Sequence, residues 1–378
     1  MDINTNQQKI DEFWMQHCIK LAENGFFTTQ PNPRVGCVII NDNQIIAEGM
    51  HLKRGEAHAE AMALKKAGSA ASGATCYVTL EPCSHYGLTP PCAEALVKAG
   101  VSRVVIGMID PNPIVAGKGI AILKAANIAV TAGILESEVR ALNAGYIKRM
   151  ETGRPYVRVK LAMSLDGNIA CHNGQSQWLT NRLSRSDVQQ WRAMSCAVIT
   201  GANTITEDDP SLNVRWNEMM SPVDAQFQRQ PLRIIVDTNA RTKNDAKILS
   251  LEGSTIMASC TEDTQKRQSW MAAGGQWLTV NKKNEKVDLS DLLSHLGKMN
   301  CNEVLVEAGS ELCGAFTREG LVDEYIIYIS PKFIGHSGKS LLNLDPIDSL
   351  SECKQLNFKE VTPLAGDLRV IATLQTTN

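Results

Sequence analysis

The chain has 378 residues, of which 43% are hydrophobic and 21% charged, as in a folded globular protein of more than one domain. Its formal net charge of −2 gives no excess of positive charge to attract the phosphates of a nucleic acid, which argues against nucleic acid as a partner. No apolar run reaches the length of a membrane span, and the polar N-terminal segment MDINTNQQKIDEF does not resemble a secretion signal. We therefore expect neither a membrane partner nor secretion.

The chain contains 11 cysteines, a high number. Most of them, including Cys37, Cys76, Cys196 and Cys260, lie in apolar segments typical of strands, where cysteine acts as a small buried hydrophobe. Without a secretion signal, a framework of disulfides is not expected. The cysteine pattern therefore indicates a cytoplasmic protein with reduced thiols.

The first 148 residues alternate between helical and extended patterns. Residues 7–24 place apolar side chains near a 3.6-residue period, and residues 35–49 form two apolar runs around a turn at Asn41–Asn43. Further helices are predicted at 56–67, 91–99 and 136–150, further strands at 74–80 and 101–108, and the alternation continues through 119–134. This order predicts one α/β domain of about 145 residues, a typical domain size.

A second α/β domain is predicted over the rest of the chain. Its polar Gly–Pro entry lies in the segment ETGRPYVRVKLAMSLDG, so we place the boundary near 148–154 and assign domains to 1–148 and 149–378. Strands are predicted at 156–164, 196–205, 232–238, 254–259, 276–280 and 302–309, followed by paired strands at 323–333 and 368–375. Leu292–Met299 and Ser310–Arg318 are predicted to be helices between strands.

Four residues of the first domain form a pattern that indicates a metal site. His58 precedes a helix with Glu60 in its first turn, while Cys83 follows a strand and Cys92 begins the next helix. One histidine and two cysteines give zinc three protein ligands and leave a fourth position open, as in catalytic sites. Glu60 is placed to take a proton from zinc-bound water and deliver it to a substrate nitrogen. The pattern H-x-E…P-C…C therefore predicts a nucleobase deaminase that holds one zinc ion per chain.

Two other interpretations of this pattern stay open on the residues alone. A structural zinc ion could be closed by His85 or Cys76 as a fourth ligand, in a scaffold or partner-binding protein. An RNA-editing deaminase would share the metal pattern but needs a basic face, which the net charge of −2 does not favour. Zinc content measured beside ammonia release separates a structural site from an enzyme.

Three segments, HAEAMAL, TLEPCSHYGLTPPC and DPNPIVAGKG, indicate which kind of nucleobase deaminase the first domain resembles. Eight residues separate the two cysteines, and this longer loop resembles that of the bifunctional riboflavin-biosynthesis deaminase–reductase family. The resemblance implies a cytidine-deaminase-like three-layer α/β/α domain, in which Asn32, Ala59 and His85 line the pocket for a pyrimidine ribotide. The family usually carries Lys or Arg where this chain has Leu88; if that cation helps to bind the substrate phosphate, another residue must do so here, and none is assigned.

The second domain carries VLVEAGSELCGAF at 304–316, which predicts a strand, a glycine-containing turn and a helix whose first amides can bind a pyrophosphate. With VKLAMSLDGNIA, SQWLTN and TGANTITEDDPSLNVR, it resembles the reductase half of the same family. That resemblance implies a dihydrofolate-reductase-like α/β fold and NADPH as cofactor. It implies cofactor contacts from Ala162, Trp178, Thr204, Asp208, Gly309, Ser310, Glu311, Leu312, Cys313 and Gly314, and ribotide contacts from Lys160, Ser176, Arg192, Leu212, Arg215 and Glu307.

The resemblance spans nearly the whole chain, with both domains in the family's order. It implies zinc-dependent deamination of 2,5-diamino-6-ribosylamino-4(3H)-pyrimidinone 5′-phosphate. Reduction of the ribosyl side chain by NADPH would then give 5-amino-6-ribitylaminouracil 5′-phosphate. We expect a homo-oligomer, either a dimer or a tetramer, that acts on this small molecule. No residue is assigned at this stage to the 2′-phosphate that distinguishes NADPH from NADH.

Overall fold

The computed structural model describes residues 3–86 and 90–375. The chain divides into two compact units, Met1–Gly153 and Arg154–Asn378. The division falls within the expected range of 148–154, after helix α6 (Ala144–Thr152), which Gly153 ends with φ 72°. Within the described ranges, no helix is long and apolar enough to cross a membrane.

The first unit is built on a five-stranded sheet with the strand order β2-β1-β3-β4-β5. β1 pairs antiparallel with β2 and β3, whereas β3, β4 and β5 are parallel. The strands are β1 (Gly36–Asn41), β2 (Gln44–Met50), β3 (Thr75–Leu80), β4 (Arg103–Met108) and β5 (Ala129–Ala132). The helices are α1 (Ile3–Glu23), α2 (Ala59–Ala67), α3 (Cys92–Ala99), α4 (Lys118–Ala125), α5 (Glu136–Leu142) and α6.

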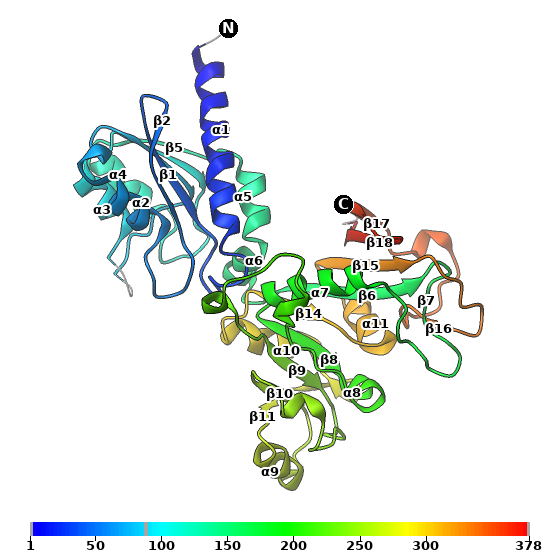
Figure 1. Cartoon of the computed structure of the whole chain (residues 1–378). Coiled ribbons are helices and arrows are strands. Elements are labelled where there is room, and N and C mark those ends of the chain that lie inside the picture. Colours follow the sequence, from blue (N-terminus) through cyan, green and yellow to red (C-terminus); the bar gives the residue numbers. More distant parts are fainter. Residues whose placement is uncertain (1–2, 87–89, 376–378) are drawn as a thin grey trace. The chain divides into compact units, whose positions relative to one another are not determined.

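Helices cover both faces of this sheet, as Figure 1 shows. Alternate residues of a strand point to opposite faces, so Cys37 and Ile39 belong to one buried cluster and Val38 and Ile40 to another. The first cluster includes α2, α3 and α4, and the second includes α1, α5 and α6. The unit is therefore the three-layer α/β/α domain that the sequence predicted.

The single helix predicted at 136–150 is wrong, because the structure has two helices that meet at Asn143. The Asn143 side chain accepts a hydrogen bond from the Arg34 amide at 2.8 Å and donates one to the Arg34 carbonyl at 2.9 Å. The Asn143 amide still bonds to the Val139 carbonyl, and the Asn143 carbonyl accepts from the Ile147 amide. The helices therefore break at Asn143 through its backbone angles (φ −117°, ψ 22°), while its side chain holds Arg34. The pairing with Arg34 also fixes the start of the segment that leads into β1.

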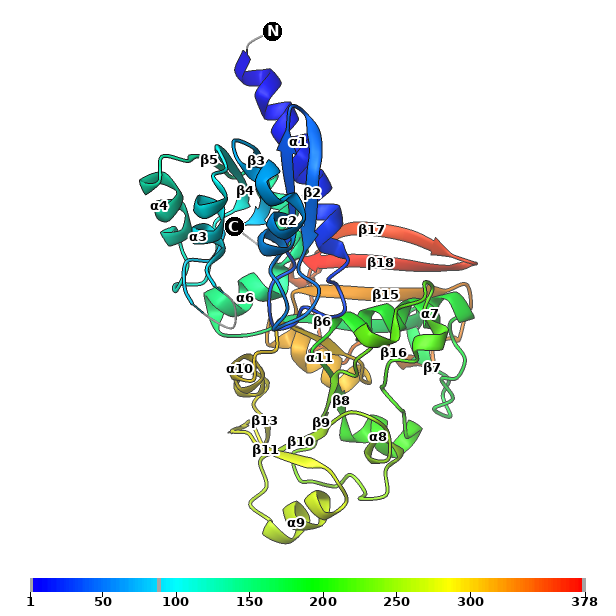
Figure 2. The ribbon, with the colours of Figure 1, turned by 60° about the vertical axis from the view of Figure 1, so that its left-hand side comes forward.

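The second unit contains a nine-stranded sheet with the order β11-β10-β9-β8-β14-β6-β15-β18-β17. Strands from β11 to β15 run parallel, and β18 and β17 complete the sheet as antiparallel neighbours (Figure 2). The strands are β6 (Tyr156–Ser164), β8 (Ala197–Gly201), β9 (Leu232–Val236), β10 (Thr255–Ser259), β11 (Gln276–Thr279), β14 (Glu303–Val306), β15 (Glu324–Ser330), β17 (Leu356–Leu364) and β18 (Asp367–Leu374). Two short pairs lie outside it: β7 (Asn168–Ala170) with β16 (Lys339–Ser340), and β12 (Lys282–Lys283) with β13 (Lys286–Val287).

Five helices accompany this sheet. They are α7 (Arg182–Met194), α8 (Ala202–Asp208), α9 (Thr264–Ala272), α10 (Leu289–Lys298) and α11 (Ser310–Arg318). Leu292 and Phe316 place α10 and α11 in one buried cluster, while Val188, Ile205 and Trp270 place α7, α8 and α9 in the other. Both faces of the parallel part are therefore covered, as such sheets require.

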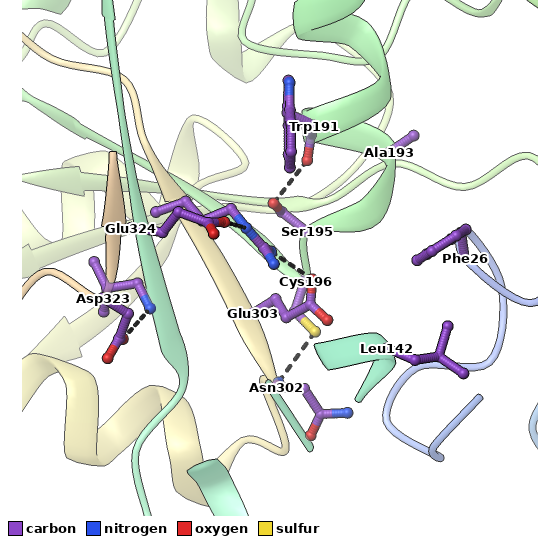
Figure 3. A network of polar contacts seen from close by, with 12 residues as sticks. Phe26, Leu142, Trp191, Ala193, Ser195, Cys196, Asn302, Glu303, Asp323 and Glu324 are labelled. Carbon is purple, nitrogen blue, oxygen red and sulfur yellow. Dashed lines mark hydrogen bonds and ion pairs between the residues drawn. The ribbon is translucent and has the colours of Figure 1, made fainter. Parts of the chain in front are cut away.

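A buried ion cluster lies within this sheet (Figure 3). Arg158 of β6 contacts Glu303 of β14 at 2.7 Å and Glu324 of β15 at 2.8 Å, and all three residues are buried. Lys359 lies 3.5 Å from Glu324, so two cations and two carboxylates balance in charge. Removing the Arg158 side chain would deprive the buried Glu303 of this cation, which costs about 3–5 kcal/mol.

Candidate functional site

His58, Cys83 and Cys92 meet in the first unit. His58 caps the start of α2, Cys83 follows β3, and Cys92 is the first residue of α3. His58 Nδ1 lies 3.4 Å from Cys92 Sγ and 3.6 Å from Cys83 Sγ, and the three candidate ligand atoms lie within 4.8 Å of one another. The sequence-predicted metal residues are therefore brought together from three separate elements.

These distances fit a zinc ion. Zinc–nitrogen and zinc–sulfur bonds of about 2.1 and 2.3 Å at a tetrahedral angle place neighbouring ligand atoms about 3.6 Å apart. The Cys92 thiol and amide hydrogen-bond to Cys83 and, with His58, hold the pKa of Cys83 at about 4. A thiolate is the form that binds metal. The donor set, the spacing and the ionised sulfur all suit zinc.

Glu60 lies in the first turn of α2 and is 4% exposed. Burial raises the pKa of Glu60 to about 7, and the negative Cys83 adds to this shift. A carboxyl group with a pKa near neutrality can both accept and donate a proton.

The close approach of α2 to β2 depends on Gly49, because a Cβ there would lie 2.0 Å from the Ala59 carbonyl oxygen.

His51 is a residue that the sequence analysis missed, and it orients Asn32. His51 Nδ1 lies 3.1 Å from the carbonyl oxygen of Ala57, which can only accept, so Nδ1 carries the proton. His51 Nε2 is then an acceptor, and the Asn32 amide nitrogen donates to it at 3.1 Å. The Asn32 oxygen is left as the acceptor that can face a ligand. A histidine in isolation, 19 residues from its partner, gives no sequence signal for this role.

For the other residues predicted to contact the pyrimidine, the structure shows no hydrogen bond, within the described ranges, that orients the side chain toward a ligand. The Ala59 side chain is fully buried, so only its backbone could meet a substrate. His85 is exposed on the loop between the two cysteines. Leu88 lies outside the described residues.

Glu81 is a second residue that the sequence analysis did not single out. Its buried carboxylate accepts hydrogen bonds from the amides of Asp110, Gly117 and Ile120 at 3.3, 2.9 and 3.2 Å. In addition, a Cβ at Gly119 would lie 2.0 Å from the carbonyl oxygen of Pro82. The segment DPNPIVAGKG is therefore fastened against the residues that immediately precede Cys83.

The second unit contains a cleft of about 1660 Å³ at the carboxyl ends of the parallel strands. This is where ligands bind in open parallel sheets. Fourteen of the residues predicted for this unit line it: Lys160, Ala162, Ser176, Trp178, Arg192, Thr204, Asp208, Leu212, Arg215, Glu307, Gly309, Ser310, Glu311 and Leu312. The structure thus brings together residues separated by up to 152 positions, the interval from Lys160 to Leu312.

Two predicted cofactor residues do not line the cleft. Cys313 is fully buried in α11, and its amide already bonds to the Gly309 carbonyl. Gly314 packs against the backbone of Asn343, where a Cβ would lie 2.2 Å from oxygen. A helix leaves only its first amides without intrahelical partners, so an anion at this turn would meet the amides of Ser310 to Leu312.

Glu307 and Arg192 form a buried bidentate pair, with Arg192 Nε and Nη2 at 2.6 and 3.0 Å from the two carboxylate oxygens. Arg192 Nη1 donates to the Asn213 carbonyl at 3.0 Å. Burial raises the pKa of Glu307, but Arg192 more than offsets this, so the pKa lies below its usual value. Burial lowers the pKa of Lys160, against the opposing effect of Glu307. Arg192 is therefore occupied mainly by protein partners, whereas Lys160 faces the cleft with its charge only partly compensated.

Helix α7, which carries Arg192, is held by a second polar cluster. Asp187 accepts hydrogen bonds from Tyr328 at 2.6 Å and from Arg369 at 2.8 Å, which ties α7 to β15 and β18.

Near the cleft entrance, Trp178 is 66% exposed, and the Arg185 guanidinium lies 4.6 Å from its ring centre. Trp178 is therefore available to a ligand.

The geometry defines a class of protein: a zinc-dependent pyrimidine deaminase joined to an α/β reductase. Comparison with known proteins agrees for each half. Residues 8–108 match the model of the cytidine and deoxycytidylate deaminase zinc-binding region, and residues 155–370 match that of the RibD C-terminal domain.

Whole-chain relatives are similar over both halves. The riboflavin biosynthesis protein RibD of Escherichia coli K12 is 45% identical over 95% of this chain and 98% of its own length. The crystallised Acinetobacter baumannii RibD, form 1, is 44% identical, with a TM-score of 0.90 over 98% of this chain and all of its own. The Thermotoga maritima diaminohydroxyphosphoribosylaminopyrimidine deaminase/5-amino-6-(5-phosphoribosylamino)uracil reductase is 30% identical, with a TM-score of 0.85 over the same shares.

The chain belongs to the RibD family of riboflavin biosynthesis proteins. It is a bifunctional deaminase and reductase whose cofactors are zinc and NADPH. The family and fold class expected from the sequence are confirmed.

Proposed function

We propose that unit Met1–Gly153 deaminates 2,5-diamino-6-ribosylamino-4(3H)-pyrimidinone 5′-phosphate and that unit Arg154–Asn378 then reduces the ribosyl side chain to ribityl. The observation that carries this proposal is the convergence of His58, Cys83 and Cys92 beside the buried Glu60. The cleft beyond the parallel strands supports the second activity. The product is 5-amino-6-ribitylaminouracil 5′-phosphate.

In the deaminase unit, His58, Cys83 and Cys92 would hold zinc, with the fourth position open to water or substrate. Zinc, when bound, activates water for attack at the amino-bearing carbon. Glu60 would take a proton from that water and return it to the leaving nitrogen, because its buried carboxyl lies in the first turn of α2, two residues from His58. Asn32, oriented by His51, would accept a hydrogen bond from a ring or amino N–H of the pyrimidine.

In the reductase unit, NADPH supplies the hydride that is added at C1′ of the open-chain sugar, and a proton is added at the attached nitrogen. The amides of Ser310 to Leu312 would bind the pyrophosphate. Lys160 and Arg215 would bind the ribotide phosphate. Among the described residues, Lys160 has no carboxylate in ion-pair contact, and Arg215 contacts Glu218, itself partly exposed, at 2.8 Å. Arg192, in contrast, is held by the buried Glu307. The Arg192–Glu307 pair would then position Glu307 toward the sugar hydroxyls.

The protein is proposed to be a cytoplasmic homo-oligomer, a dimer or a tetramer. Strand β17 supports this assembly, because it ends the nine-stranded sheet and exposes Phe358 by 67% and Val361 by 52%. An uncovered strand edge with apolar side chains is suited to pairing with a second copy. The metal-binding thiols must stay reduced, which supports a cytoplasmic location.

The test is a sequential assay. Zinc-loaded protein is incubated with the diaminopyrimidinone ribotide, and ammonia is measured first; NADPH is then added and its absorbance followed. We expect stoichiometric ammonia followed by loss of NADPH absorbance. Ammonia release without later NADPH oxidation, or NADPH oxidation that occurs only with the undeaminated compound as substrate, would overturn the proposed order.

A further inference from the structure

Basic side chains gather at the carboxyl end of β9, where Arg241 and Lys247 line the cleft with Asp237 and Thr238. No role was expected for this segment from the sequence. Four other basic residues that line the cleft are paired with carboxylates: Arg192 with Glu307, Arg215 with Glu218, Lys283 with Glu319, and Lys339 with Glu207. Across the described residues, Arg241 has no such ion pair. Other basic residues of the cleft wall, among them Lys160, Lys247 and Arg318, share this property, but only Arg241 and Lys247 lie between β9 and β10. The charge of Arg241 is therefore available to an anionic ligand.

The backbone of Arg241 is fixed by a buried carboxylate. Asp237 is 1% exposed, and its Oδ2 accepts from the Arg241 amide at 2.6 Å and from the Thr242 amide at 2.7 Å. The other oxygen of Asp237, also buried, makes no hydrogen bond with the described part of the chain. Because both oxygens are buried, the carboxylate serves the backbone of this turn and is not presented to a ligand in the cleft. The turn that carries Arg241 is thus held rigidly.

The Arg241 side chain is exposed and reaches the neighbouring helix. Its Nη2 lies 3.3 Å from Asn203 Oδ1, near the start of α8. Because the Asn203 oxygen accepts this bond, the amide nitrogen of Asn203 remains as a second donor. The guanidinium keeps further N–H groups, which can bind a phosphate in a fork.

The sheet order places this turn at the adenosine end of the cofactor. Pyrophosphate is proposed at the start of α11, after β14, and the ribotide at Lys160 of β6, on one side of β14. β8 and then β9 follow on the opposite side. A dinucleotide with its nicotinamide over β6 therefore extends its adenosine half across β8 toward β9.

We propose that Arg241, held by Asp237 and assisted by Asn203, binds the 2′-phosphate of NADPH and determines the preference for NADPH over NADH. The inference rests on the proposed placement of the cofactor in the reductase unit. The 2′-phosphate is the dianionic group that NADH lacks. A guanidinium fork without a carboxylate partner is complementary to it in charge and shape.

Calorimetric binding of 2′,5′-ADP and 5′-AMP to the full chain tests this assignment without turnover. We expect Arg241→Gln to weaken 2′,5′-ADP binding by about 10- to 100-fold, the loss of a charge-assisted hydrogen-bonded contact. Binding of 5′-AMP, which lacks the 2′-phosphate, should change little. Arg241→Lys should be intermediate, because it keeps the charge and loses the fork.

Lys283→Gln is the matched control, since it removes one positive charge from the same cleft at a residue already paired with Glu319. It should leave the preference for 2′,5′-ADP intact. Unchanged 2′,5′-ADP affinity in Arg241→Gln, or an equal loss in Lys283→Gln, would overturn the assignment. If the wild-type protein oxidises NADPH while either result holds, only this inference fails. If the wild-type protein neither binds 2′,5′-ADP nor oxidises NADPH, the proposed function fails with it.

Discussion

At the residue scale, the proposed roles assign the two activities to different side chains, and Glu60 is the residue that tests this assignment. Glu60→Gln keeps the shape of the side chain but removes the carboxylate that is proposed to take and return a proton. We expect ammonia release to fall by about 10²- to 10⁴-fold, the usual contribution of general acid–base catalysis. NADPH oxidation on the deaminated intermediate should persist, because Glu60 lies in the other unit. Simultaneous loss of both rates would contradict independent sites.

Zinc retention tests the residues that surround this proton shuttle. Cys83→Ser replaces a thiolate with a neutral hydroxyl, which is a poor zinc ligand. Metal analysis should give well below one zinc per chain. Cys353→Ser is the matched control, because Cys353 is a free and exposed cysteine in the other unit. Stoichiometric zinc in Cys83→Ser would refute the ligand role of Cys83.

Residue types and spacing predicted the side chains that the structure brings together as a candidate zinc site, because His-x-Glu and Pro-Cys each lie within one local segment. Orientation was not predictable in the same way. The direction of the Asn32 amide depends on His51, and the bidentate Glu307–Arg192 pair joins residues 115 positions apart. Such partners come into contact only when the chain folds. The sequence shows which side chains could form these bonds but not which of them meet.

At the element scale, Glu81 joins the end of β3 to the loop before α4, and we expect it to be a positioning residue for Cys83. Glu81→Gln places an amide N–H against backbone N–H groups that now donate to the carboxylate. Losing charge-assisted bonds worth about 1.5–3 kcal/mol each should raise the zinc dissociation rate at least tenfold. Zinc release to a chelator measures this rate, and NADPH oxidation on the deaminated intermediate reports an intact second unit.

The control for Glu81 is Glu23→Gln, an exposed carboxylate at the end of α1. It changes the charge of the same unit equally and should leave zinc release unaltered. If Glu81→Gln lowers thermal stability but releases zinc at the wild-type rate, Glu81 is structural and does not position the metal ligand.

Elements with apolar periodicity were predictable, and those without it were not. The paired strands β15 and β18 and helix α11 follow the predicted segments closely. Helix α7 was missed because its buried side is largely polar, with Ser184, Asp187, Gln189 and Arg192. These side chains are buried because they bond to partners far along the chain, which no helical period of apolar residues reveals. Ser184 and Asp187 bond to residues of β15 and β18, and Gln189 and Arg192 bond to residues of the loops. β17 was missed because most of its residues are exposed.

At the scale of the whole molecule, each unit has its own buried clusters, and one ionic group in the first unit makes its stability depend on pH. Asp11 is 2% exposed and contacts Arg103 at 2.7 Å and Tyr77 at 3.0 Å. Burial raises the pKa of Asp11, but the hydrogen bonds from Arg103 and its neighbours outweigh this and lower it below 3.8. The folded state therefore favours the ionised carboxylate. Its contribution is present above the unfolded pKa and is lost as pH falls through the folded pKa.

We therefore expect Asp11→Asn to destabilise the first unit at neutral pH by about 1–3 kcal/mol, the cost of unmatched buried partners. The difference from wild type should shrink below pH 3.8, the usual pKa of the carboxyl, where the wild-type group also becomes neutral. Ammonia release that remains after heating reports the first unit, and NADPH oxidation reports the second. Asp11→Asn should lower the temperature at which ammonia release is lost and leave that of NADPH oxidation unchanged. Glu12→Gln, on the same helix with a partly exposed carboxylate, is the control. Equal loss of both activities in Asp11→Asn would show that the units do not unfold independently.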